Sequence, residues 1–176
     1  NAVEEGRGVY DNIKKYFGFL VSCNISEILI IFIAILVGLP APLTATQILL
    51  INLVTDGLPA VALSADSYEP NALSRKPRKQ GIPIYRGLEP FIIYFPIIMT
   101  AVALMVFGYM YWAYNNILIA QTAVFLTISI SEFYMAFVCR STIYSSLKVG
   151  IFKNKYLVLA VLSSLIITFG IIYINP

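Results

Sequence analysis

Three acidic residues stand inside long apolar stretches of this sequence, where carboxylates are unusual. Glu27, Asp56 and Glu132 are flanked mainly by aliphatic and aromatic side chains, and no Lys or Arg occurs within these stretches to neutralise them. A carboxylate at the centre of a membrane helix costs about 2.5 to 3.5 kcal/mol on insertion scales. We therefore expect protons, metal cations or water in a cavity to compensate the three acids.

Helical spacing places two of these acids beside amide side chains. Asn24 and Glu27 are three residues apart, and Asn52 precedes Thr55 by three residues and Asp56 by four. Residues three or four apart share one face of a helix. Each of the two helices is thus predicted to present an amide and a carboxylate together, and the short connection between them predicts antiparallel neighbours whose polar faces can meet.

The ligand types in this cluster favour a hard cation. Carboxylate, carboxamide and hydroxyl oxygens suit calcium, which takes six to eight oxygen ligands, better than magnesium, which keeps its waters. Gly57 and Pro59 follow Asp56 directly and are expected to weaken the helix, leaving backbone carbonyls free as further ligands. Ligand type alone does not distinguish sodium. The alternative is that the polar residues only link helices by hydrogen bonds and that the acids are protonated.

The elements that must position these residues are membrane helices. Hydrophobic residues make up 59% of the 176 residues and charged residues 12%, far from the composition of soluble domains. About 20 apolar residues cross the hydrocarbon core of a bilayer. Five stretches are long enough, at about 16–37, 43–64, 88–114, 117–138 and 156–174. The sequence predicts an all-α integral membrane protein, a bundle of five transmembrane helices in the lipid bilayer.

The basic residues predict the orientation of the bundle. All twelve Lys and Arg residues lie in the segments 1–15, 65–87 and 139–155, and none lies in the two short connections near 38–42 and 115–116. By the positive-inside rule, the N-terminus and the two longer loops are cytoplasmic.

The same pattern predicts two parts in the chain. Residues 1–15 form a cytoplasmic stalk or hinge segment that continues into the first span, and residues 16–176 form a transmembrane cation-binding domain with cytoplasmic loops 65–87 and 139–155. The basic loop 65–87 is interpreted as a solvated loop that fixes orientation; the alternative is a surface that docks a cytoplasmic domain or anionic lipid.

Other classes of site are excluded or disfavoured by the residues that the chain lacks. With no histidine, imidazole ligation and histidine-based catalysis are excluded, and no catalytic residue or nucleic-acid partner is predicted. The absence of a Cys-Pro-Cys element disfavours copper and zinc transport. The two cysteines, Cys23 and Cys139, have no disulfide-like spacing and are interpreted as packing residues.

The sequence resembles the C-terminal membrane region of P-type ATPases, specifically calcium pumps of the sarcoplasmic and endoplasmic reticulum type. The most specific matches are Asn24-Ile-Ser-Glu27, similar to the fifth transmembrane helix of the family, and Asn52-Leu-Val-Thr-Asp-Gly-Leu-Pro59, similar to the sixth. Thr127-Ile-Ser-Ile-Ser-Glu132 matches the eighth helix more weakly, and Val3-Glu4-Glu5-Gly6-Arg7 is similar to the hinge and stalk. The resemblance implies that the five spans are equivalent to transmembrane helices five to nine.

In that family, the resemblance implies two calcium sites. The first would use the residues Asn24, Glu27, Thr55, Asp56 and Glu132. The second would use Asn52 and Asp56, together with a Glu and carbonyls from a fourth helix that this chain does not contain. Sodium/potassium pumps usually carry Asp at the position of Asn52, so this residue favours calcium, and Glu27 favours a two-site pump. The very short connection at 115–116 favours a compact prokaryotic member.

The resemblance also implies that other domains supply the chemistry. The chain has no Asp-Lys-Thr-Gly-Thr phosphorylation motif, no Thr-Gly-Glu-Ser loop and no nucleotide-binding domain. ATP and magnesium would bind in missing actuator, phosphorylation and nucleotide domains of the same polypeptide, with calcium as the transported ion and protons carried back. The alternatives are a sodium or other monovalent-cation pump, a self-contained channel or secondary transporter, and a structural membrane-anchor subunit.

Overall fold

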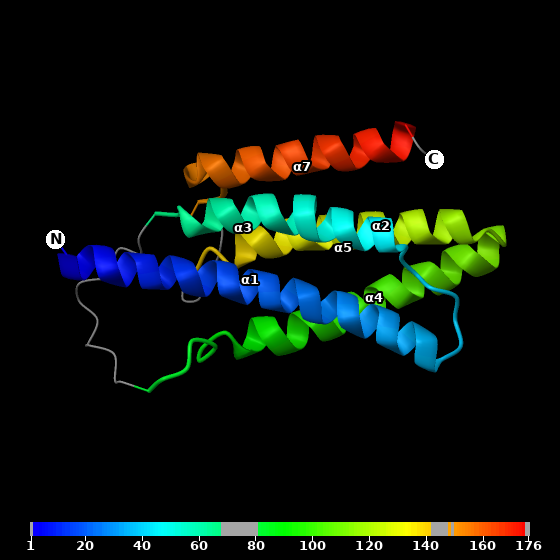
Figure 1. The fold of residues 1–176 in the computed structure, drawn as a ribbon, viewed down its shortest axis with the longest axis horizontal. Helices are drawn as coiled ribbons and strands as arrows, with labels where there is room; N and C mark the ends of the chain where they lie inside the picture. The colour runs from blue at the N-terminus through cyan, green and yellow to red at the C-terminus, as the bar shows by residue number, and fades with distance from the viewer. Residues whose placement is uncertain (1, 68–80, 142–147, 149, 175–176) are drawn as a thin grey trace.

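The computed structural model describes all residues except 1, 68–80, 142–147, 149 and 175–176, and every regular element within the described residues is a helix (Figure 1). The elements are α1 (Ala2–Leu36), α2 (Ala45–Leu50), the π-helix η1 (Ile51–Asp56), α3 (Gly57–Ser64), α4 (Glu89–Tyr114), α5 (Ile117–Val138), the 3-10 turn η2 (Ile151–Lys153) and α7 (Lys155–Ile174). Five helical units are long and apolar enough to cross a membrane, with α2, η1 and α3 together forming the second. The predicted five-helix membrane bundle is confirmed.

Local sequence explains where these helices begin and end. Thr44 caps α2, with its hydroxyl accepting from the Gln47 backbone N–H and the Gln47 side chain accepting from the Thr44 backbone N–H. Asn115 takes a left-handed conformation (φ 48°) that ends α4, and the Asn116 side chain caps α5. Two residues thus reverse the chain between the third and fourth spans.

The two ends of the bundle differ in their connections. We call the end where α1, α4 and α7 begin and α3 and α5 end the loop end. The opposite end, which holds the connections at 37–44 and 115–116, is the turn end (Figure 1). Much of the two predicted loops, including residues 68–80 and 142–147, lies outside the described residues. Residues 2–15 and the first span form one uninterrupted helix, α1.

Packing divides the interior into two apolar clusters. Helix α1 packs against α3 and α4, α4 packs against α5, and α7 lies beside α3. The cluster nearer the loop end includes Phe19, Leu63 and Phe133. The cluster nearer the turn end includes Ile30 and Ile128. Between the two clusters, α1, the π-helix η1 of the second span and α5 each contribute buried polar residues.

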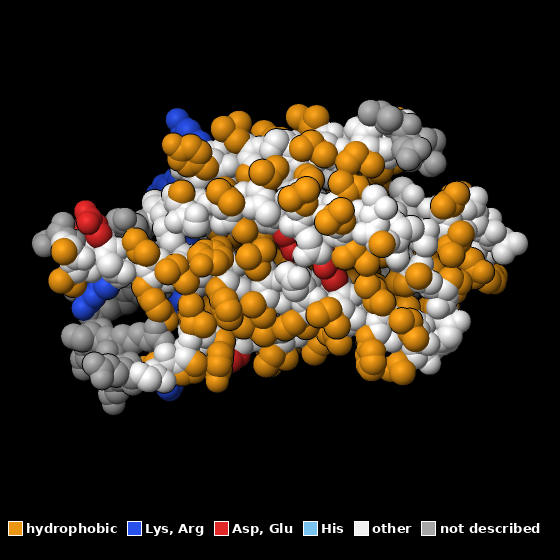
Figure 2. Space-filling model, in the orientation of Figure 1, with side chains coloured by type: hydrophobic (Ala, Val, Ile, Leu, Met, Phe, Trp, Pro, Cys, Tyr) orange, Lys and Arg blue, Asp and Glu red, His pale blue; other side chains and the backbone are white. Residues whose placement is uncertain are grey.

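The outer surface is apolar along most of the bundle. Figure 2 shows hydrophobic side chains over all the visible helices, with Lys and Arg gathered toward the loop end and a little acidic surface between α1 and the α2–α3 segment. Large hydrophobic residues such as Ile28, Leu53 and Ile97 are exposed. A surface of this kind suits contact with lipid chains rather than water.

Candidate metal centre

The three intramembrane acids meet in one layer between the two apolar clusters. Glu27 comes from α1, Asp56 ends η1 and Glu132 comes from α5, and the three side chains are 5%, 0% and 0% exposed. Asp56 is close enough to both glutamates for their negative charges to repel one another. Residues separated by up to 105 positions thus form a single buried acidic cluster.

The first pair joins α1 to the second span. The Asn52 amide nitrogen donates to Glu27 Oε2 at 2.8 Å and also to the backbone oxygen of Ile48 at 3.0 Å. An amide NH₂ group has two hydrogens, so it can serve both acceptors. This leaves the Asn52 side-chain oxygen available as a ligand next to the Glu27 carboxylate.

The second pair joins the second span to α5. The Thr55 hydroxyl lies 2.7 Å from Glu132 Oε2 and 2.9 Å from the backbone oxygen of Ile51. Thr55 is 1% exposed, so this pair is closed off from solvent.

Asp56 stands between these pairs, and the weakly donating thiol of Cys23 is the only side-chain hydrogen-bond donor that interacts with it among the described residues. Apart from this thiol, both of its carboxylate oxygens lack a hydrogen-bond partner within the described residues, as do Glu27 Oε1 and Glu132 Oε1. Buried carboxylate oxygens are nearly always hydrogen-bonded or bound to a cation, because an uncompensated buried charge is costly. Either a bound cation or protons would compensate these four oxygens.

A sixth residue, Cys23, also lies in the layer, and the sequence interpretation did not place it there. The sulfur of Cys23, a carboxylate oxygen of Asp56 and one of Glu132 all lie within 4.8 Å of one another. Cys23 was interpreted from sequence as a packing residue, and it does contact the apolar cluster near the loop end. Its spacing of four residues before Glu27 is the signal that could have placed it on the polar face of α1.

The structure brings together five of the six predicted site residues. Glu27 pairs with Asn52, Thr55 pairs with Glu132, and Asp56 lies next to Glu132. Asn24 is half-buried one turn before Glu27 on α1, where its amide nitrogen donates to the Leu20 backbone oxygen at 2.7 Å.

The second span departs from α-helical geometry next to the acids, but it does so before Gly57 and not at the Gly57–Pro59 segment, where the sequence predicts a weak point. Gly57 keeps helical angles (φ −61°, ψ −50°), and the irregular turn is the π-helix that precedes it. The backbone oxygen of Val54 accepts from the hydroxyl of Ser164 on α7 at 2.8 Å, so this carbonyl is paired rather than free. The expectation of free backbone carbonyls beside Asp56 is therefore not met at Val54, because a neighbouring helix supplies the donor.

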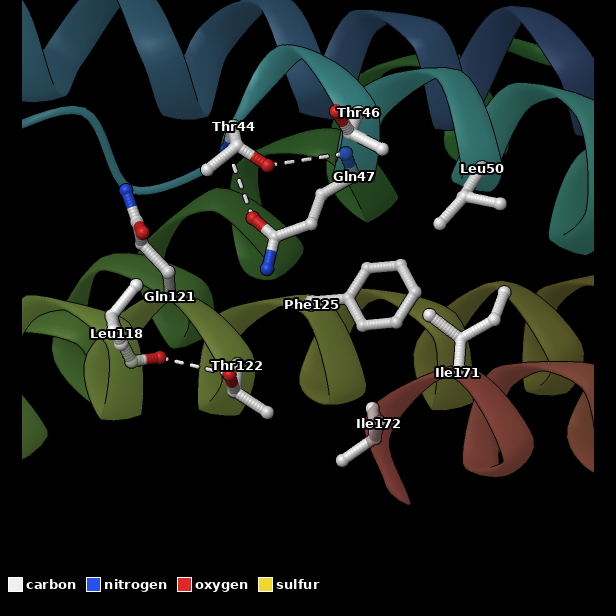
Figure 3. Close-up of a pocket in the computed structure, with 10 residues that line it drawn as sticks. All are labelled: Thr44, Thr46, Gln47, Leu50, Leu118, Gln121, Thr122, Phe125, Ile171 and Ile172. Atoms are coloured by element: carbon white, nitrogen blue, oxygen red, sulfur yellow. Dashed lines mark hydrogen bonds between the residues drawn. The ribbon is translucent and has the colours of Figure 1, made fainter. Parts of the chain in front are cut away.

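A separate polar pocket of about 320 Å³ lies at the turn end, among α2, α5 and α7 (Figure 3). Thr44 and Gln47 line one side and Gln121 and Thr122 the other, while Phe125 lies between these polar residues and Ile171. The Gln121 amide donates to the backbone oxygen of Ala41 at 2.8 Å. The pocket contains no acidic residue among those that line it, so it is distinct from the carboxylate layer.

A buried layer of carboxylate, amide and hydroxyl oxygens inside an apolar bundle is the arrangement expected of the membrane part of a cation transporter. In agreement with this class, residues 40–176 match the family described as "Cation transporting ATPase, C-terminus". The chain belongs to this family.

Individual relatives include calcium-transporting ATPases from bacteria and a fungus. Calcium-transporting ATPase 1 of Bacillus cereus is 38% identical over 191 residues, covering 99% of this chain and 22% of the relative. The calcium-transporting ATPase of Bacillus subtilis is 38% identical over 181 residues, covering 100% and 20%. The endoplasmic reticulum calcium ATPase srcA of Aspergillus fumigatus is 42% identical over 115 residues, covering 65% and 12%. This chain spans about a fifth of the length of the two bacterial relatives.

Proposed function

We propose that this chain is the cation-binding membrane part of an ATP-driven calcium pump. The observation that carries the proposal is the set of buried carboxylate oxygens of Glu27, Asp56 and Glu132 that have no hydrogen-bond partner among the described residues. A hard divalent cation would compensate these charges, and oxygen ligands at about 2.3 to 2.6 Å are what calcium takes. The calcium-transporting relatives support this choice.

The proposed ligands are the six residues that the sequence singles out. Asn24, Glu27, Asn52, Thr55, Asp56 and Glu132 would supply side-chain oxygens. The acidic surface between α1 and the α2–α3 segment (Figure 2) is the side on which a further helix of the full protein could complete the ligand set.

The proposed direction of transport is out of the cytoplasm, with the loop end on the cytoplasmic side. The segment 1–15 and the loops 65–87 and 139–155 would face the cytoplasm, where basic residues are retained. Once calcium leaves, bare carboxylates in the membrane would be costly, so protons would replace it and be carried back. ATP and magnesium would act in other domains of the polypeptide, coupled to this part through α1 and the basic loops.

Replacing Asp56 tests this function in the full-length pump. Asp56→Asn removes the carboxylate without changing the size of the side chain, and should lower the apparent calcium affinity by at least about a hundredfold, because a buried charged ligand contributes several kcal/mol. The measurement is calcium-dependent phosphorylation of the purified protein by ATP. Glu89→Gln, at an exposed acid at the start of α4, is the matched control and should leave calcium dependence unchanged.

The same assay separates the competing functions. Stimulation of the native protein by sodium but not by calcium would show a monovalent-cation pump instead. Calcium dependence that survives both Asp56→Asn and Glu27→Gln would contradict the proposed site and favour a structural membrane anchor.

A further inference from the structure

Cys23 is placed where it can act as a ligand and not only as a packing residue. Its sulfur lies within 4.8 Å of carboxylate oxygens of Asp56 and Glu132, and the three residues come from three different spans. All three side chains are 0% exposed. The Cys23 thiol is a weak hydrogen-bond donor that lies beside Asp56, and no other hydrogen-bond partner reaches either Asp56 oxygen within the described part of the chain.

One sulfur and two carboxylates form a mixed ligand set that an oxygen-only calcium site does not have. Calcium takes oxygen ligands, whereas thiolate ligands select softer cations. Ligand atoms at separations of up to 4.8 Å leave room for one cation with bonds of about 2.3 to 2.6 Å, the range that calcium uses. A thiophilic divalent cation close to calcium in size, such as Cd²⁺, fits both the space and the sulfur.

We propose that Cys23, Asp56 and Glu132 together bind a thiophilic divalent cation such as Cd²⁺ at a point that overlaps the calcium site. The two carboxylates hold the charge, and the sulfur sets the preference for the softer cation. Because Asp56 and Glu132 are shared, Cd²⁺ and Ca²⁺ exclude each other. This competition rests on the proposed calcium function, whereas the binding of Cd²⁺ by Cys23 does not.

Cadmium spectroscopy on the full-length protein tests the binding directly. Purified protein is loaded with Cd²⁺ alone, and cadmium X-ray absorption reports whether sulfur is among the atoms bound to the metal. The native protein should show one cadmium–sulfur bond. Cys23→Ser and Cys23→Ala should both lose it, and Cys139→Ser should keep it.

Cys139 is a suitable control because it is the other thiol in the chain and is equally enclosed. It is 2% exposed at the end of α5, and burial raises the pKa of its thiol. It lies outside the group formed by Cys23, Asp56 and Glu132. A cadmium–sulfur bond that disappears in Cys139→Ser but persists in both Cys23 variants would overturn the proposal.

Competition provides the second measurement. Cd²⁺ should displace Ca²⁺ from the native pump in calcium-dependent phosphorylation, and the ratio of Cd²⁺ affinity to Ca²⁺ affinity should fall by at least about tenfold in Cys23→Ser. An unchanged ratio, or the absence of a cadmium–sulfur bond in native protein that calcium activates normally, would overturn the role of Cys23 and leave the calcium function intact. A cadmium–sulfur bond in protein that calcium does not activate would instead contradict the calcium function alone.

Discussion

The Thr55 hydroxyl has one proton and two acceptors within hydrogen-bond distance. It lies 2.9 Å from the backbone oxygen of Ile51 and 2.7 Å from Glu132 Oε2, and it cannot donate to both at once. The arrangement is complete if Glu132 carries a proton and donates to Thr55, which then donates to Ile51. In this state the acid is neutral, as expected when protons occupy the site in place of a cation. Thr55 can therefore serve both states of the site, by accepting from protonated Glu132 or by giving its oxygen to a bound cation.

Removing the hydroxyl should weaken both roles. Thr55→Val keeps the shape of the side chain but leaves Glu132 Oε2 without its partner, and we expect the calcium concentration for half-maximal phosphorylation to rise by about tenfold, since one lost buried hydrogen bond or ligand contributes about 1 to 3 kcal/mol. Thr55→Ser retains the hydroxyl and should stay close to the native value. An equal loss in both variants would show that the methyl group matters and the hydroxyl does not.

At the residue scale, the sequence predicted the site residues that carry a charge, which is costly to bury, but it missed the uncharged Cys23. Glu27, Asp56 and Glu132 were found because charge inside an apolar stretch demands compensation. Cys23 was missed because a cysteine in an apolar stretch is ordinary, and only the fold shows that its sulfur lies beside two acids. The pairing of Thr55 with Glu132 joins residues 77 positions apart, which spacing along one helix could not reveal.

At the scale of elements, the second span carries the irregularity that shapes the site. In a π-helix the carbonyl of residue i pairs with the N–H of residue i+5, and the residue five positions after Val54 is Pro59, which has no N–H. Ser164 on α7, with 0% exposure, donates its hydroxyl to the Val54 carbonyl at 2.8 Å. The fifth span thus replaces a hydrogen bond that the proline removes, directly before Thr55 and Asp56.

Ser164→Ala should therefore weaken the proposed cation site, although Ser164 itself is not one of its proposed ligands. The unpaired Val54 carbonyl costs about 1 to 3 kcal/mol, and we expect faster thermal inactivation of the full-length pump together with a several-fold loss of apparent calcium affinity. Ser163→Ala is the matched control, because Ser163 is exposed and donates to Ala160 within its own helix. Equal effects of the two substitutions would show that the bond to Val54 does not support the site.

The existence of the spans was predictable, whereas their internal geometry was not. Hydropathy gave the five spans because the length of an apolar stretch follows bilayer thickness. The first apolar stretch starts near residue 16, and polar residues extend the same helix back to Ala2. The π-helix could not be predicted from the sequence. Gly57 and Pro59 indicate a weak point in the helix, but they do not show whether a neighbouring helix supplies the missing hydrogen bond.

At the scale of the whole molecule, a buried ionic network lies at the loop end of the bundle, whereas the acidic layer lies in the middle. Asp66 is 4% exposed and lies 3.3 Å from Lys15 Nζ and 3.2 Å from Arg140, with Asn154 donating to it at 3.0 Å. Asn12 donates to the backbone oxygen of Asp66 at 2.7 Å. These contacts join α1, α5 and the segment before α7 to the end of the second span. One acid thus links the four spans other than α4.

Neutralising that acid should destabilise the bundle without altering the chemistry of the cation site. Asp66→Asn leaves Lys15 and Arg140 buried without the carboxylate they share, and breaking a buried ion pair in this way typically costs about 3 to 5 kcal/mol. Ten residues separate Asp66 from Asp56, about 15 Å along a helix, so calcium affinity should change little.

The expected result is therefore a large rise in the rate of thermal inactivation of the full-length protein, with calcium-dependent phosphorylation of the surviving protein near its native midpoint. Asp66→Glu keeps the charge and should lose less stability than Asp66→Asn, while Glu89→Gln, at an exposed acid, should lose none. A native inactivation rate in Asp66→Asn would show that the network contributes nothing to stability. As the shared anion that links four spans at one end, Asp66 is expected to affect stability only. A stable variant with altered calcium affinity would therefore assign Asp66 to ion binding or coupling instead.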